Sequence, residues 1–161
     1  KVAVERIDAG ELGLSYPGGA GDSAGAARLR ESVEGAAGVL LAPPEYHGGF
    51  SALMKLAIEN LGFPSKLQGK PVALLGVAAG TLGAVKSLEQ LRSVCSHVGA
   101  LVLPGAVSIA SVDKLFDEAG ACLDAKVERR IRGGAASLAD YIERHVCPGL
   151  AMEAAARGGE R

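Results

Sequence analysis

The sequence predicts an α/β fold in which a mostly parallel sheet is covered by helices on both faces. Apolar runs typical of strands alternate along the chain with segments whose apolar residues recur every three to four positions, as in helices. The run at 39–42 is continuously apolar, as expected for a strand that is buried on both faces. A chain of 161 residues is long enough for one domain with a substantial core.

The first quarter of the chain is expected to form a strand, a loop and a helix. Residues 2–7 are predicted to be a strand, although Glu5 and Arg6 suit the edge of a sheet better than its centre. Residues 9–22 are rich in glycine and polar residues and are expected to be a surface loop. Apolar residues at helical spacing predict a helix over about Ser23–Ala36, and the strand at 39–42 follows.

The middle of the chain is expected to form a helix, a strand and a second helix. An apolar stripe predicts a helix over Ser51–Leu61, with Ser51 as its N-cap and Gly62 as its terminator. Residues 71–76 are predicted to be a strand, which tolerates proline at its first position. The next stripe predicts a helix over 85–98 that ends at Gly99.

The last part is expected to begin with a strand at 101–103 that resumes at 107–109. A final helix is predicted over about 123–145, weakened by about 1 kcal/mol at each of Gly133 and Gly134 relative to alanine. Residues 147–161 have low complexity and are expected to be a flexible tail. The predicted domain therefore covers residues 1–146.

Composition argues against several classes of protein. The chain has 17 basic and 18 acidic residues, and its densest basic run, at 129–132, adjoins acidic residues, so nucleic-acid binding is not expected. No segment approaches the roughly 18 apolar residues of a membrane span. The three cysteines lack the spacing of a disulfide framework, and neither they nor the histidines form a recognisable metal motif. We therefore expect no metal and a reduced, cytoplasmic protein, with Cys95 as a small core residue.

The segment Pro43–Gly49 is the most informative part of the sequence. It follows an apolar strand and precedes an amphipathic helix, so it is expected at the carboxyl edge of the sheet, where open α/β folds bind ligands. Its prolines stiffen the loop, and Gly48 and Gly49 permit close approach. Tyr46 is an aromatic residue in an exposed loop, which suits stacking on a flat cofactor. The alternative for Tyr46 is an ordinary surface tyrosine.

The run Pro44-Glu45-Tyr46-His47-Gly48, with the Leu53-Met54-Lys55 and Glu59 helix behind it, resembles the NADPH-dependent FMN reductase family. That family typically has Pro-Glu-Tyr-Asn-Gly here. The resemblance continues through Gly69-Lys70-Pro71-Val72, a glycine-rich loop and Gln90-Leu91-Arg92, and it covers about residues 2–144. It implies a flavodoxin-like, doubly wound parallel sheet in three α/β/α layers. It also implies hydride transfer from NADPH or NADH to FMN, and then to a small acceptor such as a flavin, quinone, azo compound or metal oxyanion.

The resemblance assigns two groups of residues to FMN binding. One wall of the site comprises Pro44, Glu45, Tyr46, His47 and Gly48. The loop beside the flavin ring comprises Gly80, Thr81, Leu82 and Gly83, with its backbone amides near the polar edge of the ring; a plain strand-to-helix turn is the alternative. No catalytic residue is assigned, because hydride transfer needs no acid or base from the protein. Glu45 is expected to have a hydrogen-bonding or interface role, and His47 either donates to the flavin or has no special role.

The family's Gly-Ser-x-Arg phosphate loop has no counterpart in these 161 residues. By the resemblance, the chain starts at the family's second strand, and the central first strand, the phosphate loop and the first helix are expected to be missing. A longer natural protein is the favoured explanation, because a sheet without its central strand leaves buried backbone groups unpaired. A genuine short variant is the other explanation.

Three functions stay open on the sequence. The first is an FMN-dependent reductase. The second is a non-catalytic flavodoxin-like interaction module or inactive fragment, which the missing phosphate loop favours. The third is another doubly wound protein with a chance match. Family members commonly form dimers or tetramers, so we expect a homodimer or homotetramer, with the helix at 51–61 and the segment around Phe116 as plausible contacts.

Overall fold

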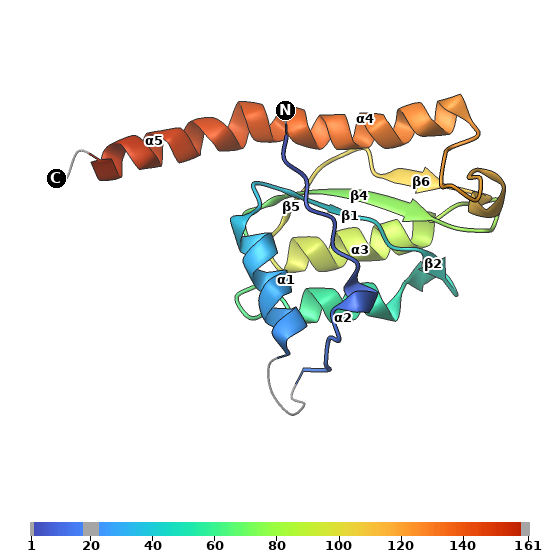
Figure 1. Ribbon diagram of the computed structural model, residues 1–161, viewed down its shortest axis with the longest axis horizontal. Coiled ribbons are helices and arrows are strands. Elements are labelled where there is room, and N and C mark those ends of the chain that lie inside the picture. The colour runs from blue at the N-terminus through green and yellow to red at the C-terminus, as the bar shows by residue number, and fades with distance from the viewer. Residues whose placement is uncertain (1, 18–22, 159–161) are drawn as a thin grey trace.

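The computed structural model describes residues 2–17 and 23–158 and contains a parallel sheet between two helical layers. The central strand is β4 (Pro71–Val77), with β1 (Val39–Leu41) on one side and β5 (Leu101–Val102) and β6 (Val107–Ile109) on the other. Three helices cover one face: α1 (Ala24–Gly35), α2 (Ala52–Glu59) and α3 (Val85–His97). Helix α4 (Ala125–Tyr141) covers the other face (Figure 1). The predicted three-layer α/β/α architecture is confirmed.

Local signals in the sequence set the helix ends. Ser23 Oγ accepts a hydrogen bond from Ala26 N at 3.1 Å, and Ser51 Oγ accepts one from Met54 N at 3.2 Å, so both serines act as N-caps. Gly62 and Gly99 follow α2 and α3 with φ of +83° and +84°, the left-handed conformation that ends a helix. The predicted N-cap Ser51 and the predicted terminators Gly62 and Gly99 are therefore confirmed, and the cap at Ser23 is a finding of the structure.

The predicted strand over residues 2–7 is wrong. This segment has no strand structure, and the side chains of Val2 and Val4 are 66% and 86% exposed. Its Glu5 instead reaches α1, where it accepts a hydrogen bond from Ser32 Oγ at 3.2 Å. An apolar pattern makes a strand only when another strand lies beside it, and within the described residues β1 forms the edge of the sheet.

The expected loop over residues 9–22 is partly structured. A 3₁₀ turn, η1 (Ala9–Glu11), lies against α2, and Leu12 is buried against α1. A Cβ on Gly25 would lie 1.7 Å from the carbonyl oxygen of Leu12, so only glycine permits this contact. Residues 18–22 of the expected loop lie outside the described residues.

The core lies mainly between the sheet and α1–α3. Strand β4 is buried along most of its length, whereas Leu40 of β1 is 39% exposed and Ala42 after it is exposed as well, so the expectation that residues 39–42 are covered on both faces is wrong for these two residues. A Cβ on Gly76 would lie 2.7 Å from Ala84 Cβ, which shows how closely β4 approaches the start of α3. Cys95 is fully buried, as predicted, and burial raises the pKa of its thiol to about 11.

Helix α4 packs on the sheet at Gly134, a residue that was expected only to weaken the helix. Gly134 faces the sheet, where an added Cβ would lie 2.9 Å from Val107 Cγ2, while the neighbouring Ala135 is exposed. Gly134 therefore permits close approach of α4, which compensates for its low helix propensity.

The C-terminal segment is helical over most of its length. A π turn (Ile142–Val146) leads from α4 into α5 (Cys147–Gly158), where a tail without regular structure was expected. The π turn changes the hydrogen-bond register directly before Pro148, which has no N–H to donate. The side chains of residues 147–157 are exposed, and Figure 1 shows α5 extending away from the sheet. Residues 159–161 lie outside the described residues.

Candidate functional site

Two loops leave the carboxyl ends of neighbouring strands. The chain after β1 stays beside β4, because Val77 N donates to the carbonyl oxygen of Pro43 at 3.3 Å and Pro44 forms a parallel bridge with Val77. The chain after β4 stays beside β6, because Ala78 N donates to the carbonyl oxygen of Ile109 at 2.9 Å. Residues 43–50, which we call the hairpin loop, and residues 78–84, which we call the glycine loop, therefore start side by side at the edge predicted for ligand binding.

The hairpin loop is a two-strand ribbon with a tight turn. Strand β2 (Glu45–Tyr46) pairs antiparallel with β3 (Gly49–Phe50). The two residues between them, His47 and Gly48, have φ of +50° and +75°. Positive φ at both central positions is the pattern of a type I′ hairpin turn, for which Asn-Gly is strongly preferred. The family that this segment resembles usually has asparagine at the position of His47. The backbone conformation of the turn is sufficient to explain that preference.

Helix α3 holds the hairpin loop in place. Glu45 Oε2 accepts a hydrogen bond from Ser87 N in the first turn of α3 at 3.0 Å. Gln90 Nε2, one turn further on, donates to the carbonyl oxygen of Gly48 at 3.1 Å. A Cβ on Gly49 would lie 3.0 Å from Gln90 Oε1, so β3 lies closely against the helix. Glu45 therefore has a hydrogen-bonding role within the protein, with a backbone amide of α3 as its partner, and its expected place in the FMN site stays a prediction.

Hydrogen bonds hold the glycine loop in place, and its shape leaves no room for a side chain at Gly83. Gly83 has φ of +70°, and a Cβ there would lie 2.4 Å from Ser108 Oγ. The same Ser108 Oγ accepts a hydrogen bond from Ala84 N at 2.9 Å. The carbonyl oxygen of Gly80 accepts hydrogen bonds from Gly83 N and Ser111 N, each at 3.2 Å. Residues from β4, β6 and the start of α3 thus fix the shape of this loop.

The top of the glycine loop presents free backbone donors. Within residues 2–17 and 23–158, the N–H groups of Gly80, Thr81 and Leu82 donate to no other residue. The side chain of Leu82 is 81% exposed, and that of Tyr46 on the hairpin loop is 64% exposed. In Figure 1 the arrowheads of β4 and β6 point to the side of the molecule where β2 lies. Apolar side chains and free N–H groups at one edge fit a ligand that has a flat ring and a polar rim, as a flavin has.

Ser108, Ser87 and Gln90 support these loops, and the sequence interpretation assigned them no role in the site. Ser108 is the polar residue in the apolar strand β6, and this break in the pattern was the signal that could have revealed it. The side chain of Ser87 is fully buried and its Oγ donates to the carbonyl oxygen of Ala84 at 3.0 Å. Nothing in the local pattern around Ser87 or Gln90 indicates that the hairpin loop, 42 residues earlier, is their partner.

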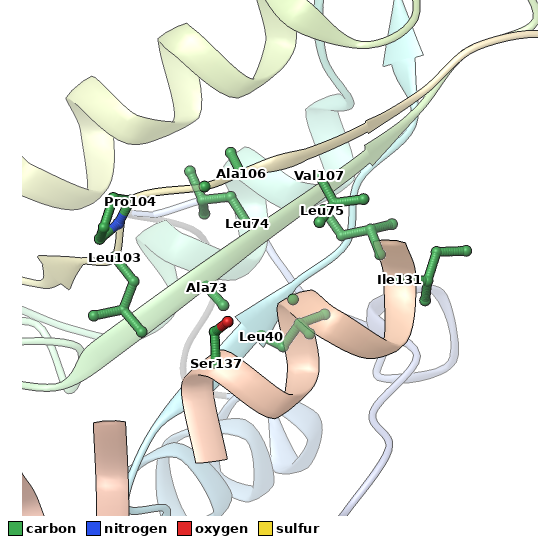
Figure 2. Close-up of a pocket in the computed structure, with 12 residues that line it drawn as sticks. Leu40, Ala73, Leu74, Leu75, Leu103, Pro104, Ala106, Val107, Ile131 and Ser137 are labelled. Atoms are coloured by element: carbon green, nitrogen blue, oxygen red, sulfur yellow. The ribbon is translucent and has the colours of Figure 1, made fainter. Parts of the chain in front are cut away.

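Two cavities lie away from the loops. One is a void of about 20 Å³ between the sheet and α4, lined by Leu40, Leu75, Val107 and Ile131 (Figure 2). It has room for about one water molecule and is a gap in the core rather than a ligand site. The other is an open groove of about 370 Å³ between α2 and α3. Lys55 and Glu59 line this groove and form an i,i+4 ion pair.

The described residues hold no group of three or more His, Cys, Asp or Glu side chains that could bind a metal ion. A search of the same part of the chain found no helix of the length and apolarity needed to span a bilayer.

A parallel sheet with helices on both faces places the chain among the open α/β folds, which bind ligands at the carboxyl edge where these two loops lie. Residues 1–114 match the NADPH-dependent FMN reductase family, and the chain belongs to that family. The matched part contains both loops and ends before α4, so it is shorter than the resemblance over residues 2–144 inferred from the sequence.

Two curated proteins illustrate the family relationship. An NAD(P)H-dependent FMN reductase of Pseudomonas aeruginosa is 33% identical over 121 residues, which are 73% of this chain and 65% of that protein. An NADPH azoreductase of Bacillus sp. (strain OY1-2) is 36% identical over 77 residues, which are 48% of this chain and 43% of that protein. The chain thus spans from under half to about two thirds of the length of these relatives.

Solved structures show the same fold. A flavoenzyme NAD(P)H:(acceptor) oxidoreductase from Paracoccus denitrificans superposes with a TM-score of 0.68 at 24% identity, covering 85% of this chain and 78% of that one. An oxidoreductase from Corynebacterium diphtheriae superposes with a TM-score of 0.62 at 22% identity, covering 76% and 64% of the two chains. The flavodoxin-like fold expected from the sequence is confirmed.

Proposed function

We propose that this chain carries the flavin-ring site of an NAD(P)H-dependent FMN reductase. The enzyme would move a hydride from NADPH or NADH to FMN and then reduce a small acceptor. The observation that carries the proposal is that the exposed Tyr46 of the hairpin loop and the free N–H groups of the glycine loop belong to loops that start at the same edge of the sheet. Membership of the FMN reductase family supports the same reading.

Each part of the site has a role in this proposal. Bound FMN supplies the hydride chemistry, and the protein contributes binding, orientation and electrostatics. Tyr46 and Leu82 would border the ring, and the N–H groups of Gly80, Thr81 and Leu82 would donate to its polar rim. Pro44 and Gly48 would shape the hairpin wall, and Gly83 would shape the glycine loop. His47 would act through its turn conformation, and no side chain needs to act as an acid or base.

The acceptor is proposed to be a small oxidant such as a flavin, quinone, azo compound or metal oxyanion. The names of two relatives, an NADPH azoreductase and a 2-hydroxy-1,4-benzoquinone reductase, support the azo and quinone classes.

We also propose a cytoplasmic homodimer or homotetramer. Phe63, directly after α2, is fully exposed, which supports the α2 end as a contact. Phe116 is half-buried, so it offers less surface for such a contact.

The proposal is tested with flavin and nicotinamide together. The purified 161-residue chain is titrated with FMN, with flavin fluorescence as the readout, and NADPH is then added without oxygen while the flavin absorbance is followed. We expect saturable binding and bleaching of the flavin absorbance. A chain that binds no FMN at millimolar concentration would contradict a flavin site in these residues and favour the non-catalytic interaction module.

A further inference from the structure

The N-terminus of α3 is capped by residues from two other parts of the fold. Its own N-cap residue, Ala84, has no side chain that can accept a hydrogen bond. Ser108 Oγ from β6 accepts from Ala84 N at 2.9 Å, and Glu45 Oε2 from β2 accepts from Ser87 N at 3.0 Å. The first turn of a helix has N–H groups without partners inside the helix, so these distant oxygens do the work of a local cap.

This cap also fixes the direction of the neighbouring tyrosine. Successive side chains of a strand point to opposite sides. Because the Glu45 carboxylate turns toward α3, the next residue of β2, Tyr46, turns away from the helix and is 64% exposed. The bond from Gln90 to the carbonyl oxygen of Gly48 holds the turn against the same helix. The hairpin loop therefore has two ties to α3, and the Glu45 tie acts directly beside Tyr46.

We propose that Glu45 is a positioning residue, which clamps the hairpin loop to the first turn of α3 and thereby holds Tyr46 in its ligand-facing orientation. The inference rests on the proposed flavin site, and it assigns Glu45 to the helix rather than to the flavin itself. A carboxylate suits this place because the N-terminus of a helix carries partial positive charge. The clamp needs an oxygen that accepts the hydrogen bond from Ser87 N, and the negative charge of the carboxylate strengthens that hydrogen bond.

The test compares Glu45→Ala with Glu45→Gln. The alanine variant loses the acceptor for Ser87 N, whereas the glutamine variant keeps a carbonyl oxygen at the same reach. Loss of the acceptor weakens this helix terminus and releases the hairpin loop beside Tyr46, so we expect flavin affinity to fall about fivefold to tenfold in Glu45→Ala. We expect Glu45→Gln to stay within about threefold of the wild type. Glu59→Ala, which removes an acidic residue on the exposed surface of α2, is the matched control and should leave flavin affinity unchanged.

Hydrogen–deuterium exchange gives a readout that does not depend on flavin. In Glu45→Ala the amide of Ser87 and the amides of the hairpin loop should exchange about tenfold faster, while those of β4 keep their wild-type rates. Glu45→Gln should restore most of the protection. Exchange that rises throughout the core would show a general loss of stability and overturn the inference, as would an unchanged Ser87 amide in Glu45→Ala. If the wild type binds no flavin, the proposed function fails, and the exchange data still decide whether Glu45 clamps the hairpin loop.

Discussion

The hairpin loop and the glycine loop lie at the same edge of the sheet but are held there by different means. The hairpin loop, which presents an aromatic side chain, is held by the side chain of Gln90 and by the Glu45 carboxylate on the backbone of α3. The glycine loop, which presents backbone N–H groups, is held by its backbone hydrogen bonds, by the Ser108 hydroxyl and by the missing side chain of Gly83. The hairpin loop uses its backbone groups for pairing between β2 and β3, so it offers a side chain to a ligand. The glycine loop leaves the N–H groups of residues 80–82 without a partner among the described residues, so it offers backbone donors.

The strongest test of this difference is Gly83→Ala. The new methyl group would lie 2.4 Å from Ser108 Oγ, at a φ of +70° that is unfavourable for alanine. Left-handed backbone costs about 1–2 kcal/mol, and the clash adds to it, so we expect a loss of about 2–3 kcal/mol in the free energy of unfolding, measured with urea. Gly80→Ala is the control, because nothing lies within 4 Å of its Cβ, and it should change stability by less than about 0.5 kcal/mol. A loss of similar size in both variants would contradict the role assigned to Gly83.

On the hairpin loop, the side chain of Tyr46 is expected to contribute most to FMN binding. We expect Tyr46→Ala to weaken FMN binding about fivefold, because an aromatic contact contributes about 0.5–1.5 kcal/mol beyond its buried area. Tyr46→Phe should bind FMN within twofold of the wild type, since the ring is kept. The control is Tyr16→Ala, which removes a tyrosine that is 79% exposed in the N-terminal segment. Fluorescence titration measures all three variants, and equal affinity in Tyr46→Ala and the wild type would remove Tyr46 from the site.

The turn of the hairpin loop offers a smaller, stabilising change. We expect His47→Asn to raise the free energy of unfolding by about 0.5 kcal/mol, because asparagine tolerates the positive φ at the first central position of a type I′ turn better than histidine does. His47→Val should have the opposite effect, since a β-branched residue is strongly disfavoured there. Urea unfolding measures both variants. A destabilised His47→Asn would show that the imidazole has a contact of its own.

The smallest expected difference concerns the phosphate of FMN. In the proposed site both loops would contact only the ring of FMN, and these 161 residues contain no Gly-Ser-x-Arg phosphate loop. We therefore predict that this chain binds FMN and riboflavin, which lacks the phosphate, with affinities within twofold of each other. Isothermal titration at two salt concentrations measures the ratio. Much tighter binding of FMN that weakens with salt would reveal a phosphate site elsewhere in the described fold.

Patterns within a few residues of one another were sufficient for most elements. Ser51 was recognisable as an N-cap because capping acts over three residues. The position of the hairpin loop at the carboxyl edge followed from the apolar strand in front of it and the amphipathic helix behind it. The turn type was harder to predict, because His-Gly lacks the signal that Asn-Gly gives.

Contacts between distant segments were not predictable from these patterns. The expected strand over residues 2–7 failed because strand formation depends on a neighbouring strand, which no local pattern encodes. The helical conformation of residues 147–158 was not predicted, because Pro148 and Gly149 are residues that usually interrupt a helix. In the structure the π turn before them leads directly into α5. Gly134 seemed only to weaken α4, and its packing on Val107 appears only when helix and sheet are assembled.

By itself, the sequence determined most of the strands and helices from α1 to α4 and the edge of the sheet at which the two candidate loops lie. These features depend on periodicity and turn chemistry, which are local properties of the chain. Only the tertiary structure decided that the Glu45 carboxylate caps α3, that Tyr46 turns outward, and that Ser108 fixes the glycine loop. Such contacts join residues 24 to 42 positions apart, and their geometry exists only after the sheet and helices have packed.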